Sequence, residues 1–399
     1  MAADTASSGL AWPNIGDAPG VVLPSGQWMI GNTLTTTPLQ QALFNENNLT
    51  FTVTGYGFRA RVIAESGLTL LPDGSVLSVD NNFGGGVNNP QTAERYVNGT
   101  WYPAGQTQQL FDTAQENGPQ ILLTDGTVLV VGANAGLASI YTPPSSAPPA
   151  SLEPGSWANT TTLPATCGPG GTTQCAGPDI PGVLLPNGRV LILAGPGGST
   201  KEFNPGVQFF EFDQTQSPPT WNQASYPGGL ASQLKTDSPG GFTKLMLLPN
   251  GQVMYTNETS TIWMYTPAAG FSPSWQPTIQ NWPSSINKNQ TYTISGYLFN
   301  GMSQANFYGD DMQNATNYPL VQVTMNGSGH VYYGRTHNHS SMAVAQPSLL
   351  VTTEFELWDC NHQIAGSACI PPSPMERGMA TLVVIANGIA SAPVNVTIN

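Results

Sequence analysis

Hydrophobic positions in the first two thirds of the chain form five pairs of short apolar segments, and a tight-turn sequence ending in glycine joins each pair. Examples are LTLLPDGSVLSVD at 68–80 and VLLPNGRVLILAG at 183–195. The turn glycines are Gly26, Gly74, Gly126, Gly188 and Gly251, spaced by 48, 52, 62 and 63 residues. Asp-Gly or Asn-Gly between β-forming residues is the strongest short-range hairpin signal, because these residues tolerate the positive φ angles of such turns. The pattern therefore predicts five β-hairpins.

Each hairpin is followed by an apolar or aromatic segment, such as AERYV at 93–97 or FFEFD at 209–213, and then by one more aromatic residue. The trailing aromatics are Phe51, Trp101, Trp157, Trp221 and Trp275. Four strands per unit are typical of a β-propeller blade, and the hairpin with its trailing tryptophan resembles a kelch repeat. We expect these aromatics to pack between blades rather than to contact a ligand.

The pattern changes after Pro283, where segments such as TYTISGYLF and ATLVVIA predict about seven strands, the number in a small immunoglobulin-like sandwich. With 44 Gly, 35 Pro and only 8% charged residues, the composition also favours short strands joined by turns. The sequence therefore predicts an all-β protein. We expect a kelch-type β-propeller of five recognisable blades at 1–283 and an immunoglobulin-like β-sandwich at 284–399.

Charge narrows the range of partners. The formal net charge is -13, which argues against nucleic acid or an anionic membrane as a partner, since both attract basic surfaces. No run of 18 apolar residues is present, so we expect no membrane span. The opening MAADTASSGLAWP lacks the basic and apolar regions of a signal peptide, which would fit a mature domain with an added Met.

The four cysteines fall into two close pairs, Cys167 with Cys175 and Cys360 with Cys369. We expect two disulfides, each closing a local loop, because the alternative zinc site lacks CxxC spacing. Disulfides predict an extracellular or cell-surface location, and glycosylation is consistent with it. The chain has nine N-x-S/T sequons, at Asn48, Asn98, Asn159, Asn257, Asn289, Asn314, Asn326, Asn338 and Asn395.

The C-terminal part carries a more specific likeness. FNGMSQANFYGDDMQNATNYPLVQV at 299–323, RTHNHSSMAVA at 335–345 and VVIANGIASAPV at 383–394 resemble the galactose oxidase and glyoxal oxidase family of copper radical oxidases, including uncharacterised bacterial relatives. The resemblance implies a seven-bladed propeller, so five units predict either a five-bladed ring or a partial propeller that self-associates. It also implies that His337 matches a copper-binding histidine, with His339 beside it.

The other copper-site residues of that family have no counterpart here. The resemblance calls for a Tyr-His pair ahead of one hairpin, a second tyrosine and a cysteine cross-linked to it. The stretches before the five hairpins contain neither tyrosine nor histidine, and the cysteines are expected to pair with each other. Divalent copper needs several nitrogen ligands, so we do not expect copper, and we place both histidines at the domain interface as hydrogen-bonding groups.

Acids precede each hairpin instead: Asp17, Glu65, Glu116, Asp179 and Asp237. In a propeller these positions surround the axis, where they would form an acidic funnel for a cation or a polar ligand, with mutual repulsion raising some pKa values. Alternatively each acid caps its own loop. Asp310 and Asp311 could hold calcium together with nearby oxygens, although the pattern favours capping of their own loop.

Three classes of function remain open. The first is an extracellular, non-enzymatic binding or surface protein whose acidic axial funnel takes a cation, a polar small molecule or a glycan. The second is a copper radical oxidase of alcohols or aldehydes with rearranged ligands. The third is a glycoside hydrolase that uses two axial carboxylates as acid and base. Fold does not decide among them, and the missing oxidase residues favour the first.

Overall fold

The computed structural model describes residues 20–31, 41–54, 67–79, 93–105, 118–133, 135–145, 153–197, 204–226, 228–239, 243–304, 317–358 and 375–399. The structure is all-β, with short helical segments at α2 (Gly228–Leu234) and the 3-10 turn η2 (Pro273–Trp275). Among the described residues, no helix has both the length and the apolar character needed to cross a bilayer.

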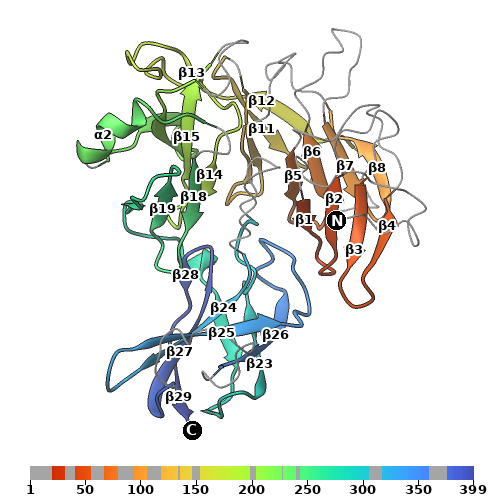
Figure 1. Cartoon of the computed structure of the whole chain (residues 1–399). Coiled ribbons are helices and arrows are strands. Elements are labelled where there is room, and N and C mark those ends of the chain that lie inside the picture. The colour runs from red at the N-terminus through yellow and green to blue at the C-terminus, as the bar shows by residue number, and fades with distance from the viewer. Residues whose placement is uncertain are drawn as a thin grey trace.

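Five antiparallel sheets follow one another along the chain and fan out above the C-terminal domain (Figure 1). Blade 1 contains β1 (Gly20–Val22), β2 (Trp28–Gly31), β3 (Gln41–Asn45) and β4 (Thr50–Val53); blade 2 contains β5 (Gly67–Leu70), β6 (Val76–Val79), β7 (Ala93–Val97) and β8 (Thr100–Pro103). Blade 3 contains β9 (Gln120–Leu122), β10 (Val128–Val131), β11 (Ala138–Thr142) and β12 (Ser156–Asn159). Blade 4 contains β13 (Cys175–Ala176), β14 (Gly182–Leu184), β15 (Val190–Pro196), β16 (Gln208–Asp213) and β17 (Thr220–Gln223); blade 5 contains β18 (Lys244–Leu247), β19 (Val253–Thr256) and β20 (Trp263–Tyr265).

The first strand of each hairpin, β1, β5, β9, β14 and β18 in turn, contacts the first strand of the next. This is a five-bladed β-propeller arrangement, as the repeats predict. The five expected hairpins are all confirmed, and their turn glycines have φ angles between +81° and +87°. The residue before each glycine fixes the turn with its side chain: Asp73 Oδ1, for example, accepts the Ser75 N–H at 2.9 Å, and Asn187 Oδ1 accepts the Arg189 N–H at 3.1 Å.

The trailing tryptophans pack between blades, as expected. Trp157 donates its indole N–H to the Ala104 carbonyl of blade 2 at 2.8 Å, and Trp221 donates to the Thr161 carbonyl at 2.8 Å. Blade 5 differs from the expected four strands, because three are observed and Trp275 lies in η2. Its ring covers the turn glycine Gly188 of blade 4 instead of completing an outer strand.

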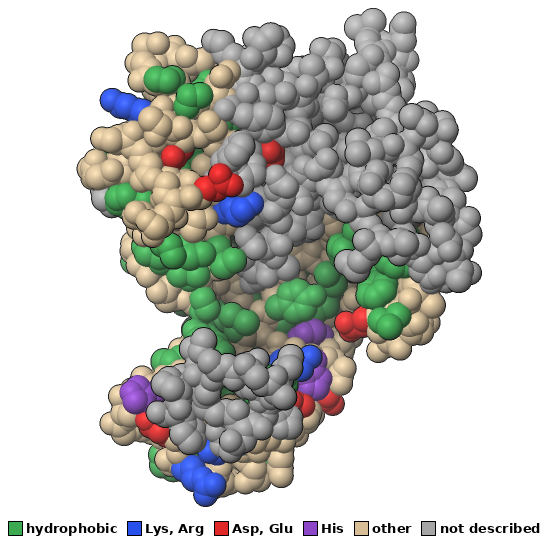
Figure 2. All heavy atoms as spheres, viewed as in Figure 1, with side chains coloured by type: hydrophobic (Ala, Val, Ile, Leu, Met, Phe, Trp, Pro, Cys, Tyr) green, Lys and Arg blue, Asp and Glu red, His purple; other side chains and the backbone are tan. Residues whose placement is uncertain are grey.

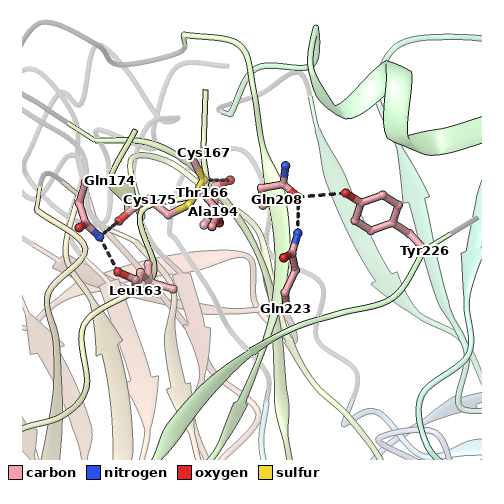
Figure 3. The surroundings of a disulfide bond; sticks show 9 residues. All are labelled: Leu163, Thr166, Cys167, Gln174, Cys175, Ala194, Gln208, Gln223 and Tyr226. Carbon is pink, nitrogen blue, oxygen red and sulfur yellow. Dashed lines mark hydrogen bonds between the residues drawn. A yellow bond between two sulfur atoms is a disulfide. The ribbon is translucent and has the colours of Figure 1, made fainter. Parts of the chain in front are cut away.

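The expected disulfide between Cys167 and Cys175 is present and buried beside blade 4 (Figure 3). Both cysteines belong to a hydrophobic cluster between blades 3 and 4 that also contains Leu129 and Ile192. Gln174 holds the same loop through hydrogen bonds from Nε2 to the carbonyls of Leu163 and Cys175. The second expected pair, Cys360 with Cys369, lies outside the described residues.

The C-terminal domain is one folded sheet whose strands run in the order β21-β23-β26-β25-β24-β27-β29-β22. Its strands are β21 (Thr278–Asn281), β22 (Ser285–Ile286), β23 (Thr291–Tyr297), β24 (Leu320–Met325), β25 (Val331–His337), β26 (Leu350–Glu356), β27 (Gly378–Ala386), β28 (Ile389–Ala390) and β29 (Val394–Ile398). Strand β25 joins two halves, because residues 331–334 pair with β24 and residues 335–337 pair with β26. A shared hydrophobic cluster lies between the halves. The sheet already includes β21, ahead of the expected boundary at 283/284.

The C-terminal domain is anchored to the turn end of the propeller. Met342 N–H donates to the Pro24 carbonyl at 2.9 Å, and Gln346 Nε2 donates to the Pro72 carbonyl. Between them, Val344 is fully buried in the hydrophobic cluster of blades 1 to 3. Gln304 completes the anchor by pairing its side-chain amide with the backbone of Val22 in β1.

Candidate ligand-binding cleft

A polar cleft of about 770 Å³ lies between blade 1 and β25 of the C-terminal domain. The propeller contributes the end of β1 and the β1–β2 and β3–β4 turns, and the C-terminal domain contributes β25, residues that follow it, and Tyr318 just ahead of β24. The lining residues are Val22, Ser25, Gly26, Gln27, Asn45, Glu46, Asn47, Tyr318, Arg335, Thr336, His337, Asn338, His339 and Met342. Figure 2 shows histidine side chains at this boundary, directly below hydrophobic side chains of the propeller.

The strand register places Arg335 and His337 on one face of β25. They lie opposite Glu356 and Glu354 of β26 respectively, and alternate residues of a strand share a face. His337 therefore has a carboxylate near each ring nitrogen: Nδ1 lies 3.5 Å from Glu354 Oε2, and Nε2 lies 3.6 Å from Glu356 Oε1.

Glu356 is held in its charged form by its neighbours. The pKa of Glu356 is lowered, first by the Trp358 indole N–H at 2.6 Å, then by the Thr291 hydroxyl at 2.7 Å, with smaller contributions from His337 and Arg335. The guanidinium carbon of Arg335 lies 5.1 Å from the centroid of the Trp358 ring, a cation–π distance. These contacts fix the direction of Arg335 at the edge of the cleft.

His339 occupies the inner wall of the cleft. Its Nδ1 lies 2.6 Å from the Thr353 hydroxyl, and its ring packs edge-on to Tyr318 at 5.7 Å between centroids. Burial, together with the nearby His337, lowers the pKa of His339 to about 4. His339 is therefore neutral near pH 7, so it can offer a hydrogen bond without adding charge.

Blade 1 supplies the amide and carboxylate groups of the opposite wall. Asn45, Glu46 and Asn47 form the turn after β3, where Asn45 Oδ1 accepts the Asn47 N–H at 2.9 Å. Burial, and to a lesser extent the charge of Glu46, raises the pKa of Tyr318, and both residues line the cleft. Among the described lining residues, Glu46 is the one carboxylate.

The expected acidic funnel can be followed at two of its five positions. Asp237 accepts hydrogen bonds from the Tyr255 hydroxyl at 2.6 Å and from Asn257 Nδ2 at 2.9 Å, so its carboxylate is bound by side chains of blade 5. Asp179 is buried just before β14 and has a φ angle of +43°. Asp17, Glu65 and Glu116 lie outside the described residues, as do the proposed calcium residues Asp310 and Asp311.

Asp179 and Asp237 lie at the ends of the blades opposite to the two histidines. Asp179 precedes β14, whose other end is the Pro186–Gly188 turn, and the turn ends of the blades are the ones that meet the C-terminal domain. The region of these two acids and the cleft are therefore separate.

The surroundings of His337 do not fit a copper centre. Both ring nitrogens lie 3.5 to 3.6 Å from carboxylate oxygens, and His339 is the one other imidazole among the described lining residues. In the described part of the chain, no group of three or more His, Cys, Asp or Glu side chains is arranged to hold a metal ion. Both histidines line the cleft, and the ring partners Glu354, Glu356 and Thr353 all belong to β26 of the C-terminal domain.

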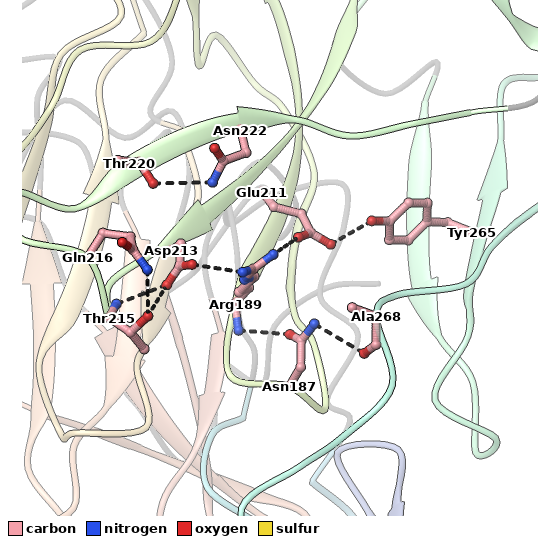
Figure 4. Close-up of polar contacts among 10 residues, drawn as sticks. All are labelled: Asn187, Arg189, Glu211, Asp213, Thr215, Gln216, Thr220, Asn222, Tyr265 and Ala268. Carbon is pink, nitrogen blue, oxygen red and sulfur yellow. Dashed lines mark hydrogen bonds and ion pairs between the residues drawn. The ribbon is translucent and has the colours of Figure 1, made fainter.

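A second polar cluster joins blades 4 and 5 (Figure 4). Arg189 bridges Glu211 at 3.0 Å and Asp213 at 2.9 Å, and the Tyr265 hydroxyl of blade 5 donates to Glu211 at 2.5 Å. Burial acts to raise the pKa of Asp213, but hydrogen bonds from Thr215 and the charge of Arg189 lower it overall. The acids are thus satisfied within the cluster, which points to a structural role between blades.

The sequence pattern singled out His337 and His339 but missed the rest of the cleft. Glu46 lies in a turn with no repeat signature, and Tyr318 and Arg335 were part of the quoted C-terminal segments without a role of their own. Only the docking of blade 1 against β25 brings these residues together. The order Arg-Thr-His-Asn-His, read as alternating strand positions, could have pointed to Arg335.

Comparison with known proteins gives no family. No family model matches the chain, and no curated protein does either. Solved structures with a similar fold include a candidate gluconolactonase, with 13% identity and a TM-score of 0.38 over 63% of this chain and 75% of that one. They also include PorZ, a surface component of the type-IX secretion system of Porphyromonas gingivalis, with 11% identity and a TM-score of 0.37. That match covers 94% of this chain and 58% of PorZ.

A third similar structure is the Bacteroides ovatus protein GH43B from a xyloglucan locus, with 8% identity and a TM-score of 0.34 over 96% of this chain and 90% of that one. At such identities and TM-scores the likeness carries no argument about function. Function has to be argued from the cleft itself.

Proposed function

We propose that this chain is an extracellular, non-enzymatic binding protein that holds a polar ligand, such as a short glycan, in the cleft between blade 1 and β25. The observation that carries the proposal is the lining of that cleft. It combines amides, hydroxyls, one carboxylate, one guanidinium and two imidazoles with the ring of Tyr318. Sugars present hydroxyl groups to amides and carboxylates, and their apolar C–H faces pack against aromatic rings.

The charge of the cleft suits a neutral or weakly charged ligand. Arg335 is balanced by Glu356, His337 lies between two carboxylates, and His339 is neutral near pH 7. Ligand recognition then depends on hydrogen bonds, which discriminate strongly because an unmatched buried polar group is costly. The Cys167–Cys175 disulfide supports the extracellular location within this proposal.

The proposal transfers the ligand from the expected axial funnel to the cleft, because Asp237 is already saturated by Tyr255 and Asn257. The kelch type of the blades, the immunoglobulin-like type of the C-terminal domain, the kinship with copper radical oxidases and glycosylation of the sequons remain parts of the proposal. A glycoside hydrolase is less well supported, since the reaction needs two carboxylates and Glu46 is the one carboxylate among the described lining residues.

The test is binding of the full-length protein to an array of purified plant and microbial oligosaccharides. Glu46→Gln and Arg335→Met should each weaken retention of the bound glycan by about 10-fold, the effect of losing one hydrogen bond of about 1.4 kcal/mol. Glu258→Gln, on blade 5, is the matched control and should bind like the wild type. Wild-type retention by both cleft variants, or no retained glycan at all, would refute the proposal.

The same bound glycans distinguish binding from catalysis. Prolonged incubation should release no new reducing ends, and protein supplied with copper should produce no peroxide from alcohols, aldehydes or sugars. New reducing ends would identify a hydrolase. Peroxide that disappears in His337→Ala would identify an oxidase with rearranged ligands.

A further inference from the structure

A second polar pocket, of about 440 Å³, lies where the turns of blade 1 meet the turns of blade 2. Blade 1 contributes the β1–β2 turn and Leu43 of β3, and blade 2 contributes the β5–β6 and β7–β8 turns. We call it the inter-blade pocket. Its volume, like that of the cleft, falls within the range of small-molecule sites.

The inter-blade pocket adjoins the cleft through the β1–β2 turn. Ser25 and Gln27 of this turn line both cavities. The cleft adds the β3–β4 turn and β25 to this shared wall, and the pocket adds the turns of blade 2. A ligand that crosses the β1–β2 turn can therefore occupy both cavities, and the hydroxyl of Ser25 and the amide of Gln27 belong to the wall that it crosses.

The turns that frame the inter-blade pocket are held in place by the fold. The β5–β6 turn packs so closely on the β1–β2 turn that a Cβ on Gly74 would lie 3.2 Å from Pro24 Cγ. The C-terminal domain holds both turns, because Met342 N–H donates to the Pro24 carbonyl at 2.9 Å and Gln346 Nε2 donates to the Pro72 carbonyl. A preformed pocket avoids much of the entropy cost of ordering loops on binding.

Asp73 gives the inter-blade pocket an oriented hydrogen-bond acceptor. Its Oδ1 accepts the Ser75 N–H at 2.9 Å and the Ser75 hydroxyl at 2.5 Å, which fixes the carboxylate on its turn. Its Oδ2 lies 3.8 Å from Nη1 of the buried Arg95, and no described residue donates a hydrogen bond to it. The Asp73 side chain is 16% exposed, so Oδ2 is fixed in direction and still reached by solvent.

Asn98 presents a side-chain amide from the β7–β8 turn. It has a φ angle of +47° and precedes Gly99, as in other Asn-Gly hairpin turns. Asn98 is exposed, and its amide has no hydrogen-bonding partner among the described residues, so it can both donate and accept. Leu23 and Leu43 supply apolar surface beside it. The pocket thus combines a carboxylate, amides, hydroxyls and apolar side chains, much as the cleft does.

We propose that the ligand of the cleft is an extended, uncharged oligosaccharide that crosses the β1–β2 turn and places a further sugar in the inter-blade pocket. The inference rests on the proposed function of the cleft and adds the length and the charge of its ligand. Asp73 is the one charged residue among the described residues that line the pocket, so a neutral sugar hydroxyl is the group that suits Oδ2. The Asn98 amide bonds a second hydroxyl, and the apolar C–H groups of the sugar pack on Leu23 and Leu43.

Binding of a size-graded series of oligosaccharides to the full-length protein tests this inference. The series is prepared from a polysaccharide whose fragments the array retains, and the protein is made in bacteria so that the Asn98 sequon carries no N-glycan. The affinity of the wild type should rise by about 10-fold at the chain length that first reaches the pocket, because further hydrogen bonds then form. Equal affinity for short and long chains would overturn the inference.

Two variants assign the added affinity to the inter-blade pocket. Asp73→Asn keeps Oδ1 for the turn but removes the carboxylate, and Asn98→Gly removes the amide while suiting the positive φ angle. Each should weaken binding of long chains by about 10-fold and leave binding of the shortest retained chains unchanged. Asp125→Asn is the matched control, since Asp125 holds the equivalent turn of blade 3 through Thr127 and lines neither cavity.

The outcomes separate this inference from the proposed function. Glu46→Gln should weaken short and long chains alike, because the cleft holds both. If Glu46→Gln weakens binding while Asp73→Asn and Asn98→Gly bind long chains like the wild type, the ligand is confined to the cleft and the inference alone is overturned. Wild-type binding by Glu46→Gln would instead refute the cleft as the site, and the inference with it.

Discussion

The strands of the propeller and those of the C-terminal domain differ in how many of their faces are buried. In the propeller, β5, β6 and β10 are buried at every position, because neighbouring blades cover both faces. In the C-terminal domain, β24 and β26 alternate between buried and partly exposed positions, because one face meets the core and the other meets water. Glu354 and Glu356 lie on the exposed face of β26. The polar groups of the cleft come from this domain and from the turns of blade 1, where side chains meet water.

The strongest test of this difference in burial is to replace one leucine by alanine in each domain. Leu191→Ala in β15 should lower the free energy of unfolding by about 2 to 5 kcal/mol, because Leu191 is fully buried between blades 4 and 5. Leu350→Ala in β26 should cost less than about 0.5 kcal/mol, since Leu350 is 48% exposed. Urea denaturation measures both changes, and similar losses would mean that the outer face of β26 is covered in solution.

The disulfide offers the next largest effect. Replacing Cys167 and Cys175 together by serine should lower the free energy of unfolding by about 2 to 3 kcal/mol, as loop-closure entropy predicts for so short a loop. The loss should appear in the melting transition of the propeller. Wild-type protein treated with a reductant should reproduce it, and a reduced protein as stable as the oxidised one would contradict the prediction.

We expect acid to lower the stability of the protein through protonation of His339 at the domain boundary. Its folded pKa of about 4 lies below the unfolded value of about 6.5, so the folded state favours the neutral ring. That stability is fully present above pH 6.5 and is lost as the pH falls toward 4. His339→Gln should reduce this acid-induced loss by about 1 to 2 kcal/mol, allowing for partial exposure of the ring.

The exposed His330 provides the control for this titration. His330→Gln should leave the wild-type loss between pH 6.5 and 4 in place, because His330 lies away from the boundary and pairs with Glu376. Denaturation curves at a series of pH values measure the effect. Equal acid sensitivity of His339→Gln and the wild type would show that the ring is hydrated.

The smallest expected effect concerns Glu356 on the outer face of β26. Its lowered pKa means that its contribution is present above its unfolded pKa of about 4.3 and is lost as the pH falls through the folded value. Glu356→Gln should cost about 0.5 kcal/mol at pH 7 and nothing at pH 3, because the side chain is partly exposed and solvent screens its interactions. A cost that persists at pH 3 would point to packing rather than charge.

The sequence predicted the repeats far better than the site. A hairpin turn depends on a few adjacent residues, so Asp73-Gly74 and Asn187-Gly188 predict their turns without knowledge of the rest of the chain. The missing fourth strand of blade 5 was not predicted, because Trp275 follows a Pro-Ser pair much as Trp221 follows a Pro-Thr pair, and the two differ in what they pack against.

The residues that line the cleft are far apart in the sequence, so the sequence did not predict which of them meet there. Asn45 and Tyr318 are far apart in the chain and meet only through the docking of two domains. The histidines were found because two lie within three residues. Their carboxylate partners Glu354 and Glu356 depend on the register of β25 against β26, which the pattern of apolar residues does not fix.

The burial of Val344 among blades 1 to 3 has a consequence for synthesis of the protein. The blades emerge from the ribosome first, yet the hydrophobic cluster that joins them contains a residue translated more than two hundred positions after β8. The N-terminal blades therefore reach their final packing only after almost the whole polypeptide has been made. Until then their apolar surfaces depend on chaperones for protection, and a chain truncated before Val344 would be a substrate for proteolysis rather than a smaller propeller.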